Sequence, residues 1–314
     1  MMKKTVLSFG EVLWDILPTR TILGGAPFNL IYRVNSLGDN GLMVSRLGRD
    51  DLGQAAFEKV VSLGLDTTHL QWDERNPTGT VQVSFDEQNN PDYVIIPHVA
   101  YDQIELTDAL LTTARNADCL CFGTLAQRSE KSRNTLQHLI ETSNNSLKFL
   151  DINLRKACYS RDTVSYSLEK ANVLKLNEDE AHQVAQMLEI SHGTIPQFCD
   201  EMIEKYWLQY CLVTLAEKGA FAQSQSDEKV YSPGFEIELV DSLGSGDAFS
   251  AGFIYKILRE ASLNEACEFG NMLGALVATQ QGGTTPITSE AINGFYNQNF
   301  KRNIYQDVKQ FSHV

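Results

Sequence analysis

The 314-residue sequence has little positive charge, no metal-ligand spacing of cysteine or histidine, and no long apolar run. It carries 26 Lys and Arg against 40 Asp and Glu, a formal net charge of −14. Binding to nucleic acids or anionic membrane surfaces rests on basic residues, so this balance argues against both partners. No apolar stretch approaches the roughly 20 residues of a transmembrane helix, so we expect no membrane segment.

The six cysteines form no C-x-x-C pair, and the six histidines form no H-E-x-x-H. These absences argue against a zinc or redox site, and we expect reduced, buried thiols in a cytoplasmic protein. The opening stretch MMKKTVLSFGEVLWD resembles a signal peptide only briefly, because its apolar run is short and Glu11 and Asp15 come soon after it. We predict a first buried strand there.

Pro-rich and Ser-rich tracts, long blocks of like charge and internal repeats are lacking as well. Nothing in the sequence therefore marks a linker between two equal domains. A single core stops growing at roughly 250–300 residues. We predict one α/β domain over residues 1–314 with a small appendage.

Apolar, β-rich runs alternate with segments of helical spacing along most of the chain. We expect helices over 129–143, 178–188 and 194–206, among others. The strand-like runs are TVLSF, LMVSRL, DCLCFG, LKFLDI, NVLKL and CLVTL. This alternation predicts an α/β fold, a mainly parallel sheet flanked by helices on both faces. Ligands bind such sheets at the carboxyl ends of the strands.

Two segments, at about 12–24 and 78–98, break the alternation. The second contains TVQVSF and YVII around the turn EQNNPD, the pattern of a hairpin. We predict that both segments form a small, discontinuous β-sheet that closes over a ligand as a lid. An uncovered apolar sheet tends to pair with another chain, so we expect a homodimer through this lid.

The stretch DSLGSGDAFSAGF at 241–253 combines small residues, two aspartates and an apolar run. We expect a helix to begin around Gly246 to Ala248, with free backbone N–H groups that bind an anion. Asp247 beside that anion would orient an attacking hydroxyl and accept its proton. With an ordinary pKa of about 3.9 it would already be ionised at neutral pH. Alternatively, Ser245 caps the helix and Asp247 only complements its dipole.

The stretch DSLGSGDAF resembles the C-terminal signature of the ribokinase-like (PfkB) carbohydrate kinases. LGGAPFNLIYRVNSLG at 23–38 resembles their Gly-Gly-x-x-x-Asn sugar motif, and GEVLWDILP at 10–18 resembles the fructokinase branch. The resemblance runs from about residue 5 to 290. It implies a ribokinase-like fold and an ATP-dependent, Mg²⁺-requiring sugar kinase. Its favoured reaction converts D-fructose to fructose 6-phosphate.

The resemblance also implies roles for individual residues. Asp247 is then the catalytic base, and Gly244, Ser245 and Gly246 form the anion hole. The sugar-binding residues are Asp15, Gly24, Gly25, Asn29 and Arg155. Structural alternatives remain open: Asp15 as a turn residue, Asn29 as a surface residue, and Arg155 in an ion pair with Asp151.

On the nucleotide side the resemblance implies contacts from Asn177, Thr214, Gly219 and Asn271. Glu180 would act near Mg²⁺ through water, although the Asn177-x-x-Glu180 spacing also predicts a helix capping box. Ala216 stands where the family usually has glycine, and its methyl group could displace the nucleotide.

A monovalent cation is a further cofactor that the resemblance suggests. Asp241 and the carbonyls near Leu243 and Gly283 correspond to a potassium site of some relatives.

Two other functions stay open at this stage. One is a related kinase that acts on 2-keto-3-deoxygluconate, another ketose or aldose, or a nucleoside. The absence of Arg and Lys from 78–97 weighs against a sugar acid. The other is a sugar-binding regulator without turnover, which Ala216 favours and the intact GSGD disfavours.

Overall fold

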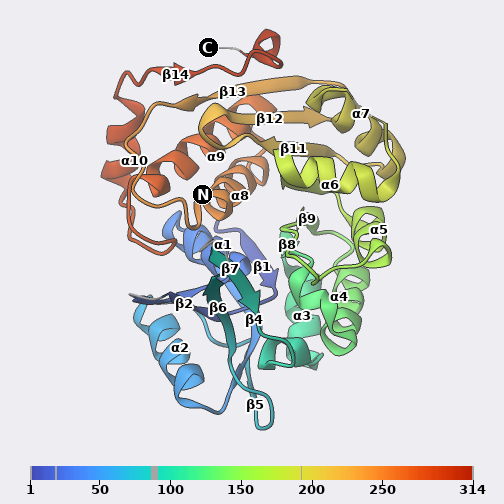
Figure 1. Cartoon of the computed structure of the whole chain (residues 1–314), viewed down its shortest axis with the longest axis vertical. Coiled ribbons are helices and arrows are strands. Elements are labelled where there is room, and N and C mark those ends of the chain that lie inside the picture. The colour runs from blue at the N-terminus through green and yellow to red at the C-terminus, as the bar shows by residue number, and fades with distance from the viewer. Residues whose placement is uncertain (1, 18–19, 86–90, 192, 313–314) are drawn as a thin grey trace.

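The computed structural model describes residues 2–17, 20–85, 91–191 and 193–312, and a ten-stranded sheet runs through its centre (Figure 1). Across the sheet the strands are β14 (Arg302–Asn303), β13 (Lys229–Phe235), β12 (Gly219–Ser224), β11 (Tyr210–Thr214), β10 (Val173–Asn177), β9 (Leu147–Asp151), β8 (Cys119–Phe122), β1 (Thr5–Phe9), β4 (Asn40–Gly48) and β5 (Leu70–Asp73). From β5 to β11 every neighbouring pair is parallel. The carboxyl ends of these strands therefore meet at one edge.

Both faces of this sheet are buried, as the alternation in DCLCFG illustrates. Leu120 and Phe122 of β8 belong to one apolar cluster, and Cys119 and Cys121 belong to another. Because successive side chains of a strand point to opposite faces, the two clusters lie on opposite sides of the sheet. The α/β fold expected from the sequence is confirmed.

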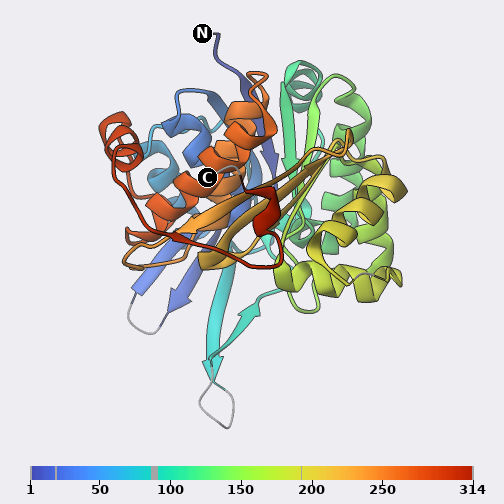
Figure 2. The ribbon, with the colours of Figure 1, turned by 90° about the horizontal axis from the view of Figure 1, so that it is seen from above.

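Helices cover both faces (Figure 2). The first cluster includes side chains of α3 (Asp108–Asn116), α4 (Glu130–Thr142), α5 (Arg161–Lys170), α6 (Glu178–Leu188) and α7 (Ile195–Tyr206). The second includes those of α1 (Ala26–Ser36), α2 (Asp51–Ser62), α8 (Ser245–Ile257) and α9 (Leu263–Ala278). Helix α10 (Ser289–Tyr296) joins a third cluster with α8 and α9. None of the described helices is long and apolar enough to cross a membrane.

Four strands form a second, smaller sheet that projects from the body (Figure 2). They are β3 (Arg20–Gly24), β2 (Leu13–Leu17), β6 (Gly79–Phe85) and β7 (Pro91–Ile95). The parallel pairing of β2 with β6 joins two segments that are distant in the sequence. Residues 18–19 and 86–90 of the expected lid lie outside the described residues. Closure over a ligand and dimer formation through this sheet stay predictions.

Two features of the fold differ from the sequence-based expectations. Strands β12 and β13 were not predicted, and they continue the main sheet in antiparallel fashion after β11. Helix α8 begins at Ser245, earlier than expected, because Gly244 adopts the left-handed conformation and ends the preceding loop. The described residues also form the short 3-10 helices η1 (Ala100–Gln103), η2 (Leu125–Arg128), η3 (Ala216–Lys218) and η4 (Lys309–Phe311).

A buried ion pair anchors the end of the small sheet to the main domain. Arg128 Nε lies 2.8 Å from Asp102 Oδ1, and the two side chains are 12% and 5% exposed. Arg128 Nη2 also donates to the carbonyl of Ile96, just after β7, at 2.8 Å. Asp102 Oδ2 accepts from the Val99 amide at 3.2 Å. The pair thus fixes the segment through which β7 returns to the body.

We expect Arg128→Met to lower the free energy of unfolding by about 3 kcal/mol, since it leaves a buried carboxylate without its partner. Urea unfolding followed by circular dichroism measures this change. Arg161→Met is the matched control, because its pair with Glu189 is exposed at 56% and 78%. An exposed pair contributes about 1 kcal/mol or less. Equal losses in the two variants would show that Arg128 is not an anchor.

Candidate active site

The two sequence motifs meet at the start of helix α8. Asn29 of α1 donates from Nδ2 to Asp247 Oδ2 at 2.8 Å, across 218 residues of sequence. Asn29 is 3% exposed and Asp247 is half-buried. Asn29 is therefore an interior residue that contacts the candidate base. The alternative that Asn29 lies at the surface is wrong.

The first turn of α8 leaves backbone amides free for a ligand. Gly244 has φ 79°, and a Cβ there would lie 2.6 Å from the Cα of Gly283. The positive φ and the lack of space for a Cβ each require glycine at this position. The first intrahelical bond runs from the Ala248 amide to the Gly244 carbonyl, so the amides of Gly246 and Asp247 precede it. The first amides of a helix have no intrahelical partner and attract anions.

Ser245 does not cap this helix. The N-cap residue is Gly244, and no side chain accepts a hydrogen bond there. Ser245 Oγ is buried without a hydrogen-bond partner in the described chain. The alternative in which Ser245 caps an ordinary helix start is therefore wrong, and the alanine usual in the family would lose no contact.

Lys175 is the most important residue that the sequence analysis did not single out. It is 7% exposed on β10, and its Nζ lies 3.1 Å from Asp151 Oδ1. A Cβ on Gly246 would stand 3.2 Å from the same Nζ, so the ammonium group lies against the glycine-rich turn. Burial alone would lower the pKa of Lys175, but nearby carboxylates, Asp151 first, hold it above its usual value. A charged residue within the apolar run NVLKL was the available signal.

The carboxyl group of Asp247 is not an ordinary one. Burial, and then the neighbouring charge of Asp151, raise its pKa to about 7, against the opposing effects of Asn29, Lys175 and Arg155. The expectation of a pKa near 3.9 is thus wrong for the ligand-free protein, because the protein interior and a second carboxylate both disfavour the ionised form. A group that titrates near neutrality is suited to proton transfer.

The candidate sugar residues from the first motif lie together. Asp15 is on β2, and its Oδ2 lies 2.9 Å from where a Cβ on Gly24 of β3 would be. Gly25 has φ 115° and is the N-cap residue of α1, and a Cβ on it would stand 2.4 Å from the carbonyl oxygen of Glu11. The two glycines are therefore required by close packing against Asp15 and the backbone of Glu11. Burial raises the pKa of Asp15, and the charge of Arg155 opposes the rise.

Arg155 is exposed in the loop after β9. Its charge lowers the pKa of Glu11, Asp15 and Asp247, each against a larger effect of burial. It does not pair with Asp151, because that carboxylate bonds to the buried lysine and to a serine of α8. The structural ion pair considered from the sequence is therefore wrong, and Arg155 faces the site as a cation without an ion pair among the described residues.

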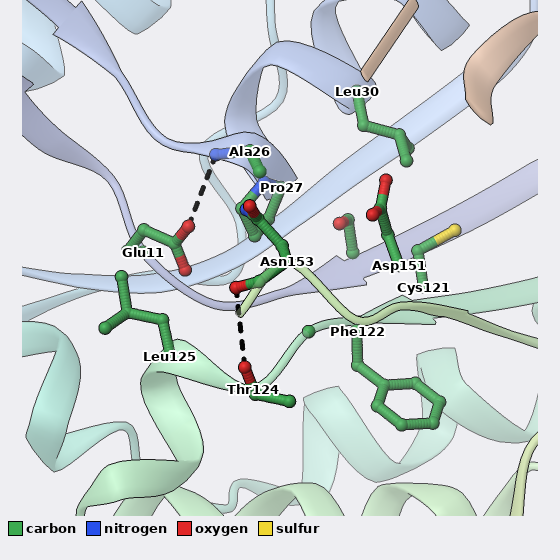
Figure 3. A pocket seen from close by; sticks show the side chains of 12 residues that line it. Glu11, Ala26, Pro27, Leu30, Cys121, Phe122, Thr124, Leu125, Asp151 and Asn153 are labelled. Carbon is green, nitrogen blue, oxygen red and sulfur yellow. Dashed lines mark hydrogen bonds between the residues drawn. The ribbon is translucent and has the colours of Figure 1, made fainter. Parts of the chain in front are cut away.

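Glu11 is a second residue that the sequence analysis did not assign to the site. It is 5% exposed, and burial raises its pKa to about 7. Its Oε1 accepts from the Ala26 amide at 3.3 Å, and it lines a cavity of about 20 Å³ with Asp151 and Asn153 (Figure 3). Such a volume suits one water molecule and is too small for a sugar.

Three of the expected nucleotide and metal residues lie at the ends of β10 and β11. Asn177 and Glu180 form the capping box that their spacing predicts. Glu180 Oε1 also accepts from the Leu154 amide at 2.8 Å. Thr214 Oγ1 donates to the carbonyl of Leu176 at 3.4 Å. The capping interpretation is confirmed, and the roles of these residues toward the nucleotide stay predictions.

Gly219 of β12 and Asn271 of α9 both contact β13 at Ser232 and Pro233. Asn271 Nδ2 donates to the carbonyl oxygens of Ser232 and Pro233 at 3.2 and 2.9 Å. A Cβ on Gly219 would stand 2.0 Å from the Ser232 carbonyl, which accounts for glycine there. Ala216 has φ 52°, so the family's glycine at this position reflects a left-handed backbone.

The residues present fit Mg²⁺ only in part. The described residues include no group of three or more Asp, Glu, His or Cys side chains placed to hold a metal ion. Both oxygens of Glu180 already accept backbone amides, from Leu154 and Asn177. Mg²⁺ is commonly bound by few carboxylates, by waters and by substrate phosphates. Glu180 therefore suits contact through water, as the resemblance implied.

A monovalent cation does not fit the expected site. Asp241 Oδ2 lies 3.2 Å from Arg20 Nη2, and the Gly283 carbonyl accepts from Arg33 Nη2 at 2.8 Å. A cation on that carbonyl would lie about 4 Å from the guanidinium, where like charges repel by about 4 kcal/mol at an effective dielectric of 20. That equals the binding free energy of a site with a dissociation constant of about 1 mM.

Comparisons with known proteins agree with this geometry. The family model described as "pfkB family carbohydrate kinase" matches residues 8–290. The chain belongs to the pfkB carbohydrate kinase family. It is therefore a phosphotransferase that acts on a sugar.

The kinase is 25% identical to fructokinase-1 of Zea mays over 92% of its own length and 96% of that protein. Its fold is that of the fructokinase with bound ATP from Xylella fastidiosa, with a TM-score of 0.81, 22% identity and coverage of 94% and 98%. A 2-dehydro-3-deoxygluconokinase from Thermotoga maritima gives 0.80 at 19% identity, covering 94% and 100%. A fructokinase from Vibrio cholerae with fructose, ADP and potassium gives 0.77 at 23%, covering 93% and 98%.

The raised pKa of Asp247 predicts a pH-dependent stability difference between the kinase and its Asp247→Asn variant. The unfolded carboxyl has a pKa of about 3.9, and the folded one about 7. The folded state therefore binds more protons between these values, and its stability falls as pH rises through this window. Above about pH 7, Asp247→Asn should be more stable by on the order of 2 kcal/mol, after allowance for partial exposure.

Thermal unfolding from pH 4 to pH 8 measures this difference, which should vanish at the acid end. Glu11 titrates in both proteins, and its titration differs between them only through the charge of Asp247, the last of the influences on its pKa. Glu204→Gln, which removes an exposed carboxylate of α7, serves as the control and should show no such trend. A difference that stays constant across the range would mean that Asp247 has an ordinary pKa.

Proposed function

We propose that the kinase transfers the γ-phosphoryl group of ATP to D-fructose and forms fructose 6-phosphate. The observation that carries the proposal is the half-buried Asp247, held by Asn29 beside the free amides of α8. The choice of fructose is supported by relatives named fructokinase that match more than nine-tenths of the chain.

The sugar would lie between the small sheet and the carboxyl ends of the main strands. Asp15 can accept hydrogen bonds from two hydroxyl groups, and Gly24 has no side chain that would crowd this carboxylate. Arg155, exposed and unpaired among the described residues, can donate to sugar oxygens. Asn29, already bonded to Asp247, fixes the distance between the sugar and the base.

Asp247 would act as the general base for the acceptor hydroxyl. The oxygen of that hydroxyl forms a bond to the γ-phosphorus as its proton passes to Asp247. The bond from the γ-phosphorus to the bridging oxygen breaks, and ADP leaves with the electron pair. Lys175 and Arg155 lower the pKa of Asp247, so they favour the ionised form that accepts the proton.

The start of α8 would stabilise the transferred phosphoryl group. The amides of Gly246 and Asp247 precede the first intrahelical hydrogen bond of α8, and the turn from Gly244 to Gly246 would let oxygen atoms approach the backbone. Lys175 behind Gly246 adds a full positive charge in a buried setting. Donors fixed before the reaction act where charge develops, at little reorganisation cost.

The nucleotide would extend from this turn toward Asn177 and Thr214, and its base toward Gly219 and Asn271. Glu180 would hold Mg²⁺ through water, and the ion would neutralise charge on the β- and γ-phosphates. The direct contacts of Glu180 are with the backbone, so its removal would also weaken the start of α6.

We expect Asp247→Asn to reduce kcat by on the order of a hundredfold to ten-thousandfold, the usual loss for a general base. The dissociation constant of the sugar should change little, because the hydrogen bond from Asn29 can be kept by an amide oxygen. A coupled assay of ADP release and calorimetry of sugar binding measure the two quantities.

Ser245→Ala is the matched control, since the Ser245 hydroxyl makes no hydrogen bond within the described chain and its amide is unchanged. Its kcat should stay within about threefold of the wild-type value, well inside the effect of removing a catalytic proton acceptor. Turnover that survives in Asp247→Asn would contradict the assignment of the base.

A panel of acceptors tests the substrate. D-Fructose should give the highest kcat/KM, ahead of 2-keto-3-deoxygluconate, ribose and a nucleoside. A preference for the sugar acid would overturn the choice of fructose and leave the phosphotransfer mechanism intact. Sugar binding by calorimetry without ADP release from any acceptor would instead support the non-catalytic regulator.

A further inference from the structure

A fully buried arginine lies behind the catalytic turn. Arg33 of α1 is 0% exposed, and its one hydrogen bond to the described residues runs from Nη2 to the Gly283 carbonyl at 2.8 Å. Its Nε and Nη1 make no hydrogen bond within the described chain. The guanidinium Cζ stands 5.0 Å from the centroid of the Tyr32 ring. A buried charge with so few partners opposes folding, so packing alone does not account for it.

The position of Arg33 connects it to each part of the catalytic turn. The Gly283 carbonyl that it binds belongs to the residue packed against Gly244, where a Cβ would lie 2.6 Å from the Gly283 Cα. Gly283 also packs against Asn29, since a Cβ on Gly283 would stand 2.9 Å from the Asn29 amide. Asn29 in turn holds Asp247. One guanidinium therefore supports the residue on which both the anion hole and the base rest.

The charge of Asp247 in turn influences the pKa of Arg33. Burial lowers the pKa of Arg33 to about 10, while the neighbouring Tyr32 and Asp247 act in the opposite direction. The group therefore remains protonated at neutral pH.

A second arginine binds the carboxylate that is expected at the cation site. Arg20 of β3 donates from Nη2 to Asp241 Oδ2 at 3.2 Å. The same carboxylate accepts the amides of Leu243 and Gly282 at 3.0 and 3.2 Å. Asp241 thus closes the loop before α8 with three donors, one of them a full positive charge.

We propose that Arg33 and Arg20 replace the monovalent cation, so that this kinase reaches full activity without K⁺ or Na⁺. The inference rests on sugar phosphotransfer and does not depend on which sugar is accepted. Two of the three groups expected at the cation site, the Asp241 carboxylate and the Gly283 carbonyl, already accept from a guanidinium. A tethered cation holds the turn at every salt composition, whereas a free ion must bind from solution.

Arg33 is a positioning residue, because it touches neither the base nor the candidate sugar contacts directly. Its loss should therefore lower kcat and leave the KM of the sugar nearly unchanged. Arg33→Met removes the charge and keeps an unbranched apolar side chain in the cavity. Arg33→Lys keeps a charge that can reach the same carbonyl.

Initial rates are measured with an accepted sugar in a series of buffers of equal ionic strength. Along the series, KCl replaces choline chloride stepwise. The wild-type rate should change by less than about twofold, since the screening of charges is held constant. Arg33→Met should lose about tenfold or more in choline, which is a loss of about 1.4 kcal/mol of transition-state stabilisation. KCl should restore part of that loss, and Arg33→Lys should stay insensitive to K⁺.

The melting temperature in the presence of ADP and Mg²⁺ is a second measurement, and it does not depend on turnover. K⁺ in place of choline should raise the melting temperature of Arg33→Met, because an ion that binds only the folded state stabilises it. The wild type should not respond. A wild-type rate or melting temperature that depends strongly on K⁺ would overturn the inference, as would an Arg33→Met variant that is fully active in choline.

Discussion

The hydrogen bond from Asn29 to Asp247 is the contact on which the site depends. It joins the N-terminal half of the sheet, through α1, to the C-terminal helices α8 and α9. It also sets the place of a carboxyl group whose ionised form is disfavoured by burial. Gly283 packs without a side chain against Asn29 and against Gly244, so α1 can approach the start of α8 this closely. The glycine-rich turn is therefore a packing device as well as an anion site.

The net charge of −14 says little about the chemistry at this place. Lys175 and Arg33 are buried cations near Asp247, and Arg155 adds a third at the surface. Glu11 and Asp151 are buried carboxyl groups that contribute the opposite charge when ionised. Burying these charges lowers the stability of the protein, as is common in active sites. The packing of the sheet and its two apolar clusters must offset this loss. The local field, set by a few interior groups, is what a phosphoryl group would meet.

Much of the fold could be predicted from the chain itself, because hydrophobic alternation along DCLCFG and the capping box at Asn177 and Glu180 are local signals. Asp247 and its glycine-rich turn could be identified from a sequence motif, which is also a local signal. The pKa of Asp247 could not be predicted, since it depends on burial in the folded protein and on the charge of Asp151, which is distant in the sequence. Lys175 and Arg33 were missed because each stands in an apolar pattern that otherwise indicates only core, although a charge in such a pattern is itself a signal.

The most direct measurement is a crystal structure of the kinase with ADP, a transition-state mimic of the phosphoryl group such as aluminium fluoride, and the accepted sugar. The mimic should lie within hydrogen-bond distance of the amides of Gly246 and Asp247, with the acceptor hydroxyl against the Asp247 carboxylate. A mimic bound away from the start of α8, with Asp247 out of reach of the hydroxyl, would contradict the mechanism.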